Sequence, residues 1–337
     1  TRVAEHGGLG YLGPPWLAWL ATSPDGLAWV REEIRIHFPG PVPYGFTPQK
    51  AFYDADEPDP QKRYKAVGFV SMISKRRSAA MAYSPDARHW TAGERLPEID
   101  SMAATTPITL AGSYGQIHDT VMYRYGRYLL AMYQHQYNPG SADIRLAVSR
   151  DGEHFNFVYP EQPLVPQGEP GAWNSGYVMP ADLVVNGTTM ALYYGSNVAG
   201  DYAMQHGMPR WRVCAGRAVA TIDRFVRVGV ADTAHTARIR TVPVIPQCTD
   251  PSMLTVNARI SNGGVLRIGL ANATNPMEEL PGFGIDDSEP ITGDAVAHPV
   301  RWKQNHGLPA GRSFCITAEL SAGADDDGVY GFRLQPA

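Results

Sequence analysis

The 337-residue sequence predicts an all-β fold, and three observations lead to this prediction. Short runs that alternate apolar and polar residues, rich in Tyr, Val and Leu, recur along the chain, as expected of strands. Glycine (34 residues) and proline (28 residues) are frequent enough to close many tight turns between such strands. A turn phrase also recurs at a regular spacing, which indicates repeated β units.

The recurring phrase places a Ser two residues before an Asp and ends on an aromatic residue. Each copy is interpreted as the end of a strand, an Asp-Gly-type turn and an aromatic ring that covers the turn. Because Ser and Asp can bond the turn's own amides, the phrase is expected to be structural. The copies lie about 60 to 70 residues apart and span Ala21–Trp29, Ala82–Trp90, Ala147–Phe155 and, more weakly, Ala218–Phe225.

Further strand-like runs precede each full copy of the phrase. Repeated units of a few strands at this period predict the blades of a β-propeller, because a radial array leaves only short, protected edges. Near Trp16–Trp29 only the closing strand of a blade is evident, so the first blade is expected to be truncated or divergent. The other expected strands are Ala51–Asp54 and Arg63–Phe69, then His118–Tyr123, Arg127–Gln134 and Asp143–Ser149, then Gly176–Val185, Thr189–Tyr194 and Trp211–Ala220.

The repeat stops after about Ala231, and the pattern changes to short strands separated by turn signals such as Asn262-Gly-Gly264. A β-sandwich is the expected fold of this part. We therefore predict a propeller domain over residues 1–231 and a C-terminal sandwich over residues 232–337. The expected sandwich strands are Ile239–Ile245, Ser252–Ile260, Val265–Ala271, Val300–Lys303, Ser313–Leu320 and Val329–Leu334.

Composition and charge limit the classes of partner. A net charge of −4 without a basic stripe argues against nucleic acid. No apolar run reaches the roughly 18 residues of a membrane span, so no membrane partner is expected. The cysteines Cys214, Cys248 and Cys315 lack metal-ligand spacing, and neither a metal nor another cofactor is expected.

The sequence says less about the cellular location and the oligomeric state of the chain. The chain starts at Thr1 rather than Met, so removal of a signal peptide or of a longer N-terminal segment is an expectation. A secreted or periplasmic location is favoured over a cytoplasmic one. The sequence leaves the oligomeric state open.

Several of these segments together resemble a known group of enzymes. The chain is similar to the invertase and fructanase family of glycoside hydrolases, with arabinanase-type enzymes as relatives. The resemblance implies a five-bladed propeller followed by a β-sandwich, and an oligo- or polysaccharide substrate. The segments that carry it, besides the turn phrase, are Phe52–Asp54 with Arg63–Lys65, Gly168–Gly176, Leu254–Ala258, Pro281–Phe283 and Val300–Trp302.

Hydrolysis of a glycosidic bond needs two carboxyl groups, one to protonate the leaving oxygen and one to attack or to activate water. The innermost strand of each propeller blade lines the axis, so candidates are expected on those strands or just before them. Asp119 opens the innermost strand of the clearest blade, where the resemblance implies an Asp that orients substrate or supports the acid. Glu169 precedes the next innermost strand, in the region that resembles the general-acid segment of arabinanase-type enzymes. Asp182 lies inside that strand as a third catalytic candidate.

Substrate-binding candidates lie around these carboxylates. Trp173 and Asn174 could offer an aromatic face and an amide to a sugar. His118 adjoins Asp119 and could bond substrate. His135, at the end of a strand, and Tyr177, at the start of one, complete the predicted binding set.

A further carboxylate cluster consists of Asp54, Asp56 and Glu57, before Pro58. Its segment reads as an outer loop between two strands, and the resemblance places it there too. We therefore interpret this cluster as structural.

The predicted function is cleavage of a glycosidic bond by carboxylate acid/base catalysis. Two alternatives stay open. No segment matches the W-M-N-D-P-type motif that carries the nucleophile in invertases, so a propeller that binds carbohydrate without catalysis is one alternative. The other is a polysaccharide lyase, which would use His118 and Tyr177 to remove a proton beside a uronate.

Overall fold

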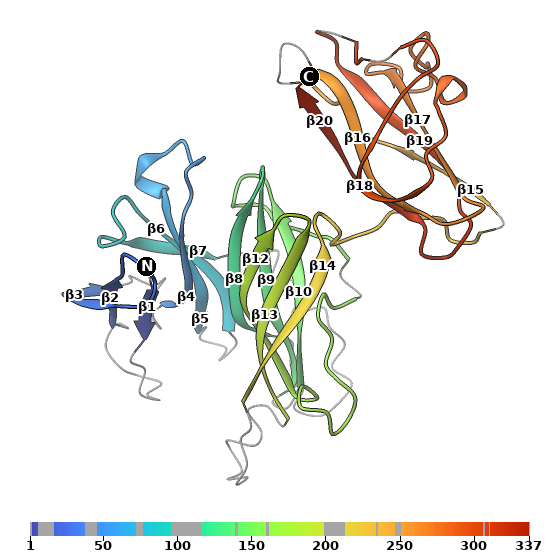
Figure 1. Ribbon diagram of the computed structural model, residues 1–337. Coiled ribbons are helices and arrows are strands. Elements are labelled where there is room, and N and C mark those ends of the chain that lie inside the picture. The colour runs from blue at the N-terminus through green and yellow to red at the C-terminus, as the bar shows by residue number, and fades with distance from the viewer. Residues whose placement is uncertain are drawn as a thin grey trace. The chain divides into compact units, whose positions relative to one another are not determined.

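The computed structural model describes residues 2–5, 17–37, 46–71, 77–95, 116–138, 141–159, 162–198, 213–233, 235–246, 251–305, 307–309 and 311–336. The chain forms two compact units. The first unit comprises residues 1–184 and 191–219, and the second comprises residues 185–190 and 220–337. Strands dominate both units, which confirms the all-β prediction (Figure 1).

Two separate antiparallel sheets begin the first unit. The N-terminal sheet contains β1 (Arg2–Glu5), β2 (Leu17–Thr22) and β3 (Val30–His37), so it has more strands than the single closing strand expected from the sequence. The next sheet runs in the order β4 (Phe46–Tyr53), β5 (Tyr64–Ser71), β6 (Arg77–Ser84) and β7 (Thr91–Arg95), and a short 3₁₀ helix, η1 (Pro60–Lys62), joins β4 to β5.

The next two blades are joined into one larger sheet. The third blade contains β8 (Gln116–Tyr125), β9 (Tyr128–Asn138), β10 (Ser141–Ser149) and the two-residue β11 (Asn156–Phe157). The fourth contains β12 (Tyr177–Asn186), β13 (Thr189–Asn197) and β14 (Cys214–Thr221). A single parallel pairing of Ala142 with Tyr177 joins β10 to β12. The described ranges hold four such blades, and the predicted number of five stays a prediction.

Both faces of the second blade are buried, as a propeller requires. Along β5 and β6, Ala66, Ala80 and Ala82 belong to a cluster shared with the N-terminal sheet. The alternate residues Val67 and Met81 belong to a different cluster, shared with β8, β9 and β10. Because side chains of a strand alternate between its faces, this period of two shows a blade packed between two neighbours.

The turn phrase forms the hydrogen-bonded structure predicted from its composition. In its second copy, Asp86 Oδ1 accepts from the amides of Arg88 and His89, both at 2.8 Å. Trp90 covers the turn and donates from Nε1 to the carbonyl oxygen of Ala87 at 3.0 Å. Asp25 and Asp151 accept the equivalent amide pairs in the first and third copies.

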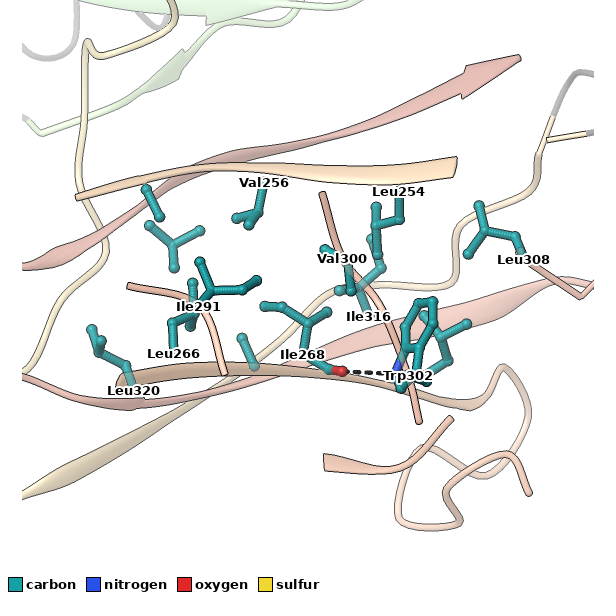
Figure 2. Close-up of a cluster of buried hydrophobic side chains, with 14 of the residues drawn as sticks. Leu254, Val256, Leu266, Ile268, Ile291, Val300, Trp302, Leu308, Ile316 and Leu320 are labelled. Carbon is teal, nitrogen blue, oxygen red and sulfur yellow. Dashed lines mark hydrogen bonds between the residues drawn. The ribbon is translucent and has the colours of Figure 1, made fainter. Parts of the chain in front are cut away.

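The second unit consists of two three-stranded sheets around one apolar core. The strand orders are β15-β19-β17 and β18-β16-β20, which is the layer arrangement of a β-sandwich. The inward-facing residues include Val256, Ile268 and Ile316, and Trp302 lies at one end of the core (Figure 2). Its elements are β15 (Thr236–Arg240), β16 (Pro251–Ile260), β17 (Val265–Asn272), η2 (Ile285–Asp287), β18 (Gly293–Pro299), β19 (Phe314–Ser321) and β20 (Gly328–Pro336).

Two predicted sandwich strands differ from the structure: Ile239–Ile245 shares only Ile239 and Arg240 with β15, and Val300–Lys303 is wrong. Val300–Lys303 is not a strand, although Val300 and Trp302 are buried core residues, and the strand at this place is β18, which ends at Pro299. The run of β18, Gly-Asp-Ala-Val-Ala-His-Pro, has few strand-favouring residues. The apolar residues after it were therefore mistaken for the strand itself.

Candidate functional site

Polar side chains gather on the first strands of three successive blades. Gln49 and Lys50 come from β4, Asp119 and Tyr123 from β8, and Asp182 from β12. Each of the two β4 residues bonds a carboxylate on a different strand. We call these five residues the axial cluster.

Irregular strand pairing positions two members of the cluster. In β4, Pro48 pairs with Gly68 and Lys50 pairs with Val67, so Gln49 is the extra residue of a β-bulge. Such a bulge changes the direction in which a side chain points, and bulges are over-represented next to active sites. Pro48 is tolerated because β4 is an edge strand of its sheet.

A second bulge lies at Asp119. In β8, Ile117 pairs with His135 and Thr120 pairs with Tyr133, so two residues of β8 oppose one residue of β9. Asp119 is one of those two residues. The bulges at Gln49 and Asp119 occupy the same position, the fourth residue, of their strands.

Gln49 bridges Asp119 and the backbone beside it. Its Nε2 donates a hydrogen bond to Oδ1 of Asp119. Its Oε1 accepts from the amide of Thr120 at 2.7 Å. Donation to the carboxylate favours the ionised form of Asp119 and fixes the orientation of its side chain.

Asp182 is held by a cation from the same strand that provides Gln49. Nζ of Lys50 lies 3.0 Å from Oδ1 of Asp182, and the amide of Leu183 donates to the same oxygen at 3.0 Å. The Asp182 side chain is 52% exposed, so solvent can reach the carboxylate. The pairing with Lys50 restricts the orientation of this carboxylate.

Tyr123 lies beside the Lys50–Asp182 pair. Burial, together with the charge of Asp182 and a hydrogen bond with it, raises the pKa of Tyr123 well above its usual value. The hydroxyl therefore stays protonated, and it donates to the carbonyl oxygen of Ala181 at 3.3 Å. The ammonium of Lys50 is 5.0 Å from the centre of the Tyr123 ring, a distance at which a cation is attracted to an aromatic face.

The loop before β12 carries the other candidates near that strand. Glu169 is exposed, and its carbonyl oxygen accepts from the amide of Ala172 at 2.9 Å. Trp173 is stacked on Tyr194, with ring centres 5.8 Å apart, and 40% of its side chain is exposed. The Asn174 side chain lies against Gly168, where any Cβ would collide with it.

Two predicted binding residues lie inside the protein. His135 is fully buried, and burial, followed by the charge of Arg145, lowers its pKa to about 3, so it stays neutral. Tyr177 is also buried, and Nε2 of Gln136 donates to its hydroxyl. Neither side chain belongs to the axial cluster. The side chain of His118 lies outside the described residues.

The carboxylates of the predicted structural cluster form an ionic network. Asp54 is fully buried, and its Oδ2 lies 3.1 Å from Nζ of Lys65. Nε of Arg124, on the neighbouring blade, donates to Oδ1 of Asp54 at 2.9 Å. Glu57 also binds Lys65, at 2.7 Å, whereas Asp56 is exposed. This network joins the second and third blades.

Sequence reasoning missed three members of the axial cluster. Gln49 and Lys50 were overlooked because the strand was expected to start at Ala51, whereas β4 begins at Phe46. The repeat itself could have identified Gln49. Asp119 was chosen because it lies near the start of the first strand of its blade, and Gln49 has the same place in the preceding blade. Tyr123 lies four residues after Asp119, a spacing that places two side chains on the same face of a regular strand.

The described ranges contain neither a candidate metal site nor a candidate membrane-spanning helix. Within those ranges, no group of three or more His, Cys, Asp or Glu side chains could hold a metal ion. Likewise, no helix there is long and apolar enough to cross a membrane.

Comparisons with known proteins found similar structures but no family. No protein-family model matches the sequence, and no curated protein matches it. A glycosyl hydrolase from Bacteroides ovatus is 18% identical, with 64% of this chain and 61% of that chain covered and a TM-score of 0.41. A family 32 β-fructofuranosidase from Bombyx mori, in complex with sucrose, is 10% identical, with 94% and 86% covered and a TM-score of 0.39.

A third similar structure is a family 43 arabinoxylan arabinofuranohydrolase from Bacillus subtilis. It is 10% identical, with 96% of this chain and 74% of that chain covered and a TM-score of 0.34. For three matched structures, the Bacteroides ovatus enzyme among them, the chain spans 47%, 57% and 61% of their length.

Proposed function

We propose that this protein is a glycoside hydrolase that cleaves a glycosidic bond in an oligo- or polysaccharide through carboxylate catalysis. The observation that carries the proposal is the pair Asp119 and Asp182 on the innermost strands of adjacent blades. Each carboxylate bonds a donor from β4, Gln49 for Asp119 and Lys50 for Asp182. The turn phrases and the resemblance of the whole chain support the same reaction class.

The surroundings of the three carboxyl candidates suggest different roles for them. Asp119, oriented by an amide donor, is suited to act as the general base or the nucleophile. Asp182, paired with Lys50, is suited to stabilise the positive charge that develops on the sugar ring. Glu169 lies on the exposed loop before β12, and no ion pair or side-chain amide bond joins it to another described side chain. It is our candidate for the general acid.

A product assay tests this assignment. The purified chain is incubated with a panel of plant and microbial polysaccharides and aryl glycosides, beside the variants Asp119→Asn, Asp182→Asn and Glu169→Gln. We expect release of reducing sugar by the native chain and a loss of about 10²- to 10⁴-fold in the variants. The exposed residues Asp56 and Glu153 provide matched controls, Asp56→Asn and Glu153→Gln, which should keep native activity.

For Glu169→Gln, substrates with an activated leaving group provide a sharper test. An aryl glycoside that needs little protonation should restore much of the rate lost with a natural glycoside if Glu169 is the acid. Equal losses of rate on both substrates would show that Glu169 is not the general acid.

A propeller that binds carbohydrate without turnover is the second candidate. The absence of a W-M-N-D-P-type nucleophile segment from the sequence favours it. Saturable binding of a glycan with no product from the native chain would establish this alternative. The lyase hypothesis has less support from the geometry, because the Tyr177 hydroxyl is buried and bonded to Gln136. Absorbance of a new double bond in the product would detect a lyase.

A further inference from the structure

The side chain of Gln49 spans two neighbouring blades at the candidate site. It comes from the extra residue of a bulge in β4 and contacts both Asp119 and the amide of Thr120 on β8. From this geometry we infer that Gln49 is a positioning residue, which holds the Asp119 carboxylate ionised and in one orientation for the reaction. The inference rests on the proposed function for its role in turnover, but the contact itself can be tested without a substrate.

The orientation of the Gln49 amide follows from its two partners. The amide of Thr120 can only donate, so the group that faces it at 2.7 Å must be the carbonyl oxygen Oε1. The other end of the same planar group, Nε2, must then face Asp119. Because Nε2 can only donate, Oδ1 of Asp119 must accept, as a carboxylate does. One backbone N–H therefore determines which end of Gln49 faces Asp119.

The position of Gln49 depends on the bulge. In a regular strand, adjacent residues point to opposite faces, yet Gln49 and Lys50 both reach carboxylates on inner strands of later blades. The extra residue of the bulge redirects one of the two side chains. A side chain that only filled space between the blades would not need two hydrogen-bonding groups directed at a carboxylate and a backbone amide of another blade.

The other charged and titratable groups of the axial cluster are unchanged in a Gln49 variant. Lys50 is on the same strand, Tyr123 is on the strand of Asp119, and Asp182 faces Lys50 from β12. Their effect on the titration of Asp119 is therefore common to the native chain and the variants. A difference in the titration of Asp119 between the native chain and a Gln49 variant therefore reports the Gln49 contact.

Two substitutions separate positioning from structural support. Gln49→Glu keeps an acceptor for the Thr120 amide but replaces the donor beside Asp119 by a second carboxyl group. Gln49→Met keeps the approximate size and removes both bonds. Gln61, exposed on η1, provides the matched controls Gln61→Glu and Gln61→Met.

The expected kinetic result differs between the two variants. Gln49→Met should lower kcat by about 10- to 100-fold with KM within about 3-fold of native, because the base is misoriented while the substrate contacts remain. In Gln49→Glu, repulsion between like charges favours the protonated form of Asp119, so the acidic limb of the rate profile should move to higher pH, and activity should recover as pH rises. Both Gln61 variants should match the native profile. A native kcat and a native acidic limb in both Gln49 variants would overturn the inference.

A substrate-free measurement keeps the inference testable if no glycan is cleaved. Carbon-13 labelling of the aspartate carboxyl groups gives one NMR signal for Asp119, assigned by its absence in Asp119→Asn. We expect this signal to titrate at higher pH in Gln49→Glu than in the native chain, with the thermal midpoint of unfolding preserved. An unchanged titration would reject the Gln49 contact. A shifted titration without any glycan turnover would support the contact and count against the proposed hydrolase instead.

Discussion

The two units of the molecule bury polar groups in different ways. In the first unit, the buried carboxylate of Asp54 pairs with two cations on other strands, Lys65 and Arg124. In the second unit, the buried carboxylate of Asp327 instead accepts from backbone amides and from the hydroxyl of Ser261. The core that fills the second unit is apolar, and the indole N–H of its Trp302 donates to a backbone carbonyl (Figure 2).

This difference follows from the architecture of each unit. Blades of a propeller meet along inner strands whose side chains face one another, so polar residues there can pair across blades and remain available to a ligand. A two-sheet sandwich encloses its inward faces completely, and an unpaired polar group there would be costly. The candidate chemistry and the ionic network therefore both lie in the first unit.

The largest effect on stability should come from breaking the ionic network of the first unit. Asp54→Ala leaves Lys65 buried without one of its two carboxylates and removes the partner of Arg124. Removing one partner of a buried ion pair typically costs about 3–5 kcal/mol, so we expect this loss in the free energy of unfolding. Urea denaturation measures it, with exposed Asp56→Ala as the control. A loss below about 1 kcal/mol would mean that the network is not a major contributor.

Acid should weaken the same network by a smaller amount, because a protonated carboxyl still fills the space. Burial raises the pKa of Asp54, but hydrogen bonds and charges of Arg124 and Lys65 outweigh burial and lower the net value. The pKa of Glu57 is lowered in the same way, burial being outweighed by Lys65.

The sign of the pH dependence follows from these lowered values. Both groups stabilise the folded state above the pKa of the unfolded carboxyls, about 4, and this contribution disappears as pH falls through the folded-state values. Unfolding midpoints measured between about pH 6 and pH 2 should fall more steeply for the native chain than for Asp54→Asn. If the unfolding midpoints of the native chain and of Asp54→Asn fell equally steeply with pH, the prediction would be contradicted.

A smaller loss is expected in the second unit when one hydrogen bond of its core is removed. Trp302 is 1% exposed, and its Nε1 donates to the carbonyl oxygen of Ile268 at 2.9 Å. Trp302→Phe leaves that carbonyl without this donor and should cost about 1–3 kcal/mol. Trp29 makes the same kind of bond, to Gly26 at 3.0 Å, but is 42% exposed. Trp29→Phe should therefore stay within about 0.5 kcal/mol of native, and equal losses would show that burial is not the cause.

The sequence was sufficient for the features that depend on local pattern. Strand alternation predicted most strands of the third and fourth blades, and the Ser-x-Asp phrase predicted the turns, because residues within one hydrogen-bonded turn are close in sequence. The strand at Val300 was misplaced because burial alone does not distinguish a strand from a core segment that follows Pro299.

The axial cluster could be predicted only in part, because its contacts join distant segments. Asp119 and Asp182 were identified from their places in the repeat. Their donors Gln49 and Lys50 were not, since a bulge breaks the alternation at this point and the bonded residues are 70 and 132 positions apart. No local pattern encodes a contact between blades.

The smallest expected effect compares copies of the turn phrase within the first unit. Gly26 and Gly152 have φ values of 76° and 83°, and the same position of the second copy holds Ala87, with φ of 61°. An L-residue in this left-handed region costs roughly 1–2 kcal/mol, whereas glycine adopts it without a Cβ clash but loses more chain entropy on folding. Ala87→Gly should therefore stabilise the protein, by about 0.5–1 kcal/mol.

The reverse change in the first copy is the matched control. A Cβ at Gly26 would contact nothing within 4 Å, so Gly26→Ala isolates the backbone effect and should destabilise by a similar amount. Thermal unfolding of the two variants measures both signs. If Ala87→Gly destabilised the protein, the contacts of the Ala87 methyl group would have to outweigh its strained backbone. The bond from Trp90 to the Ala87 carbonyl is present in both chains and cannot explain a difference.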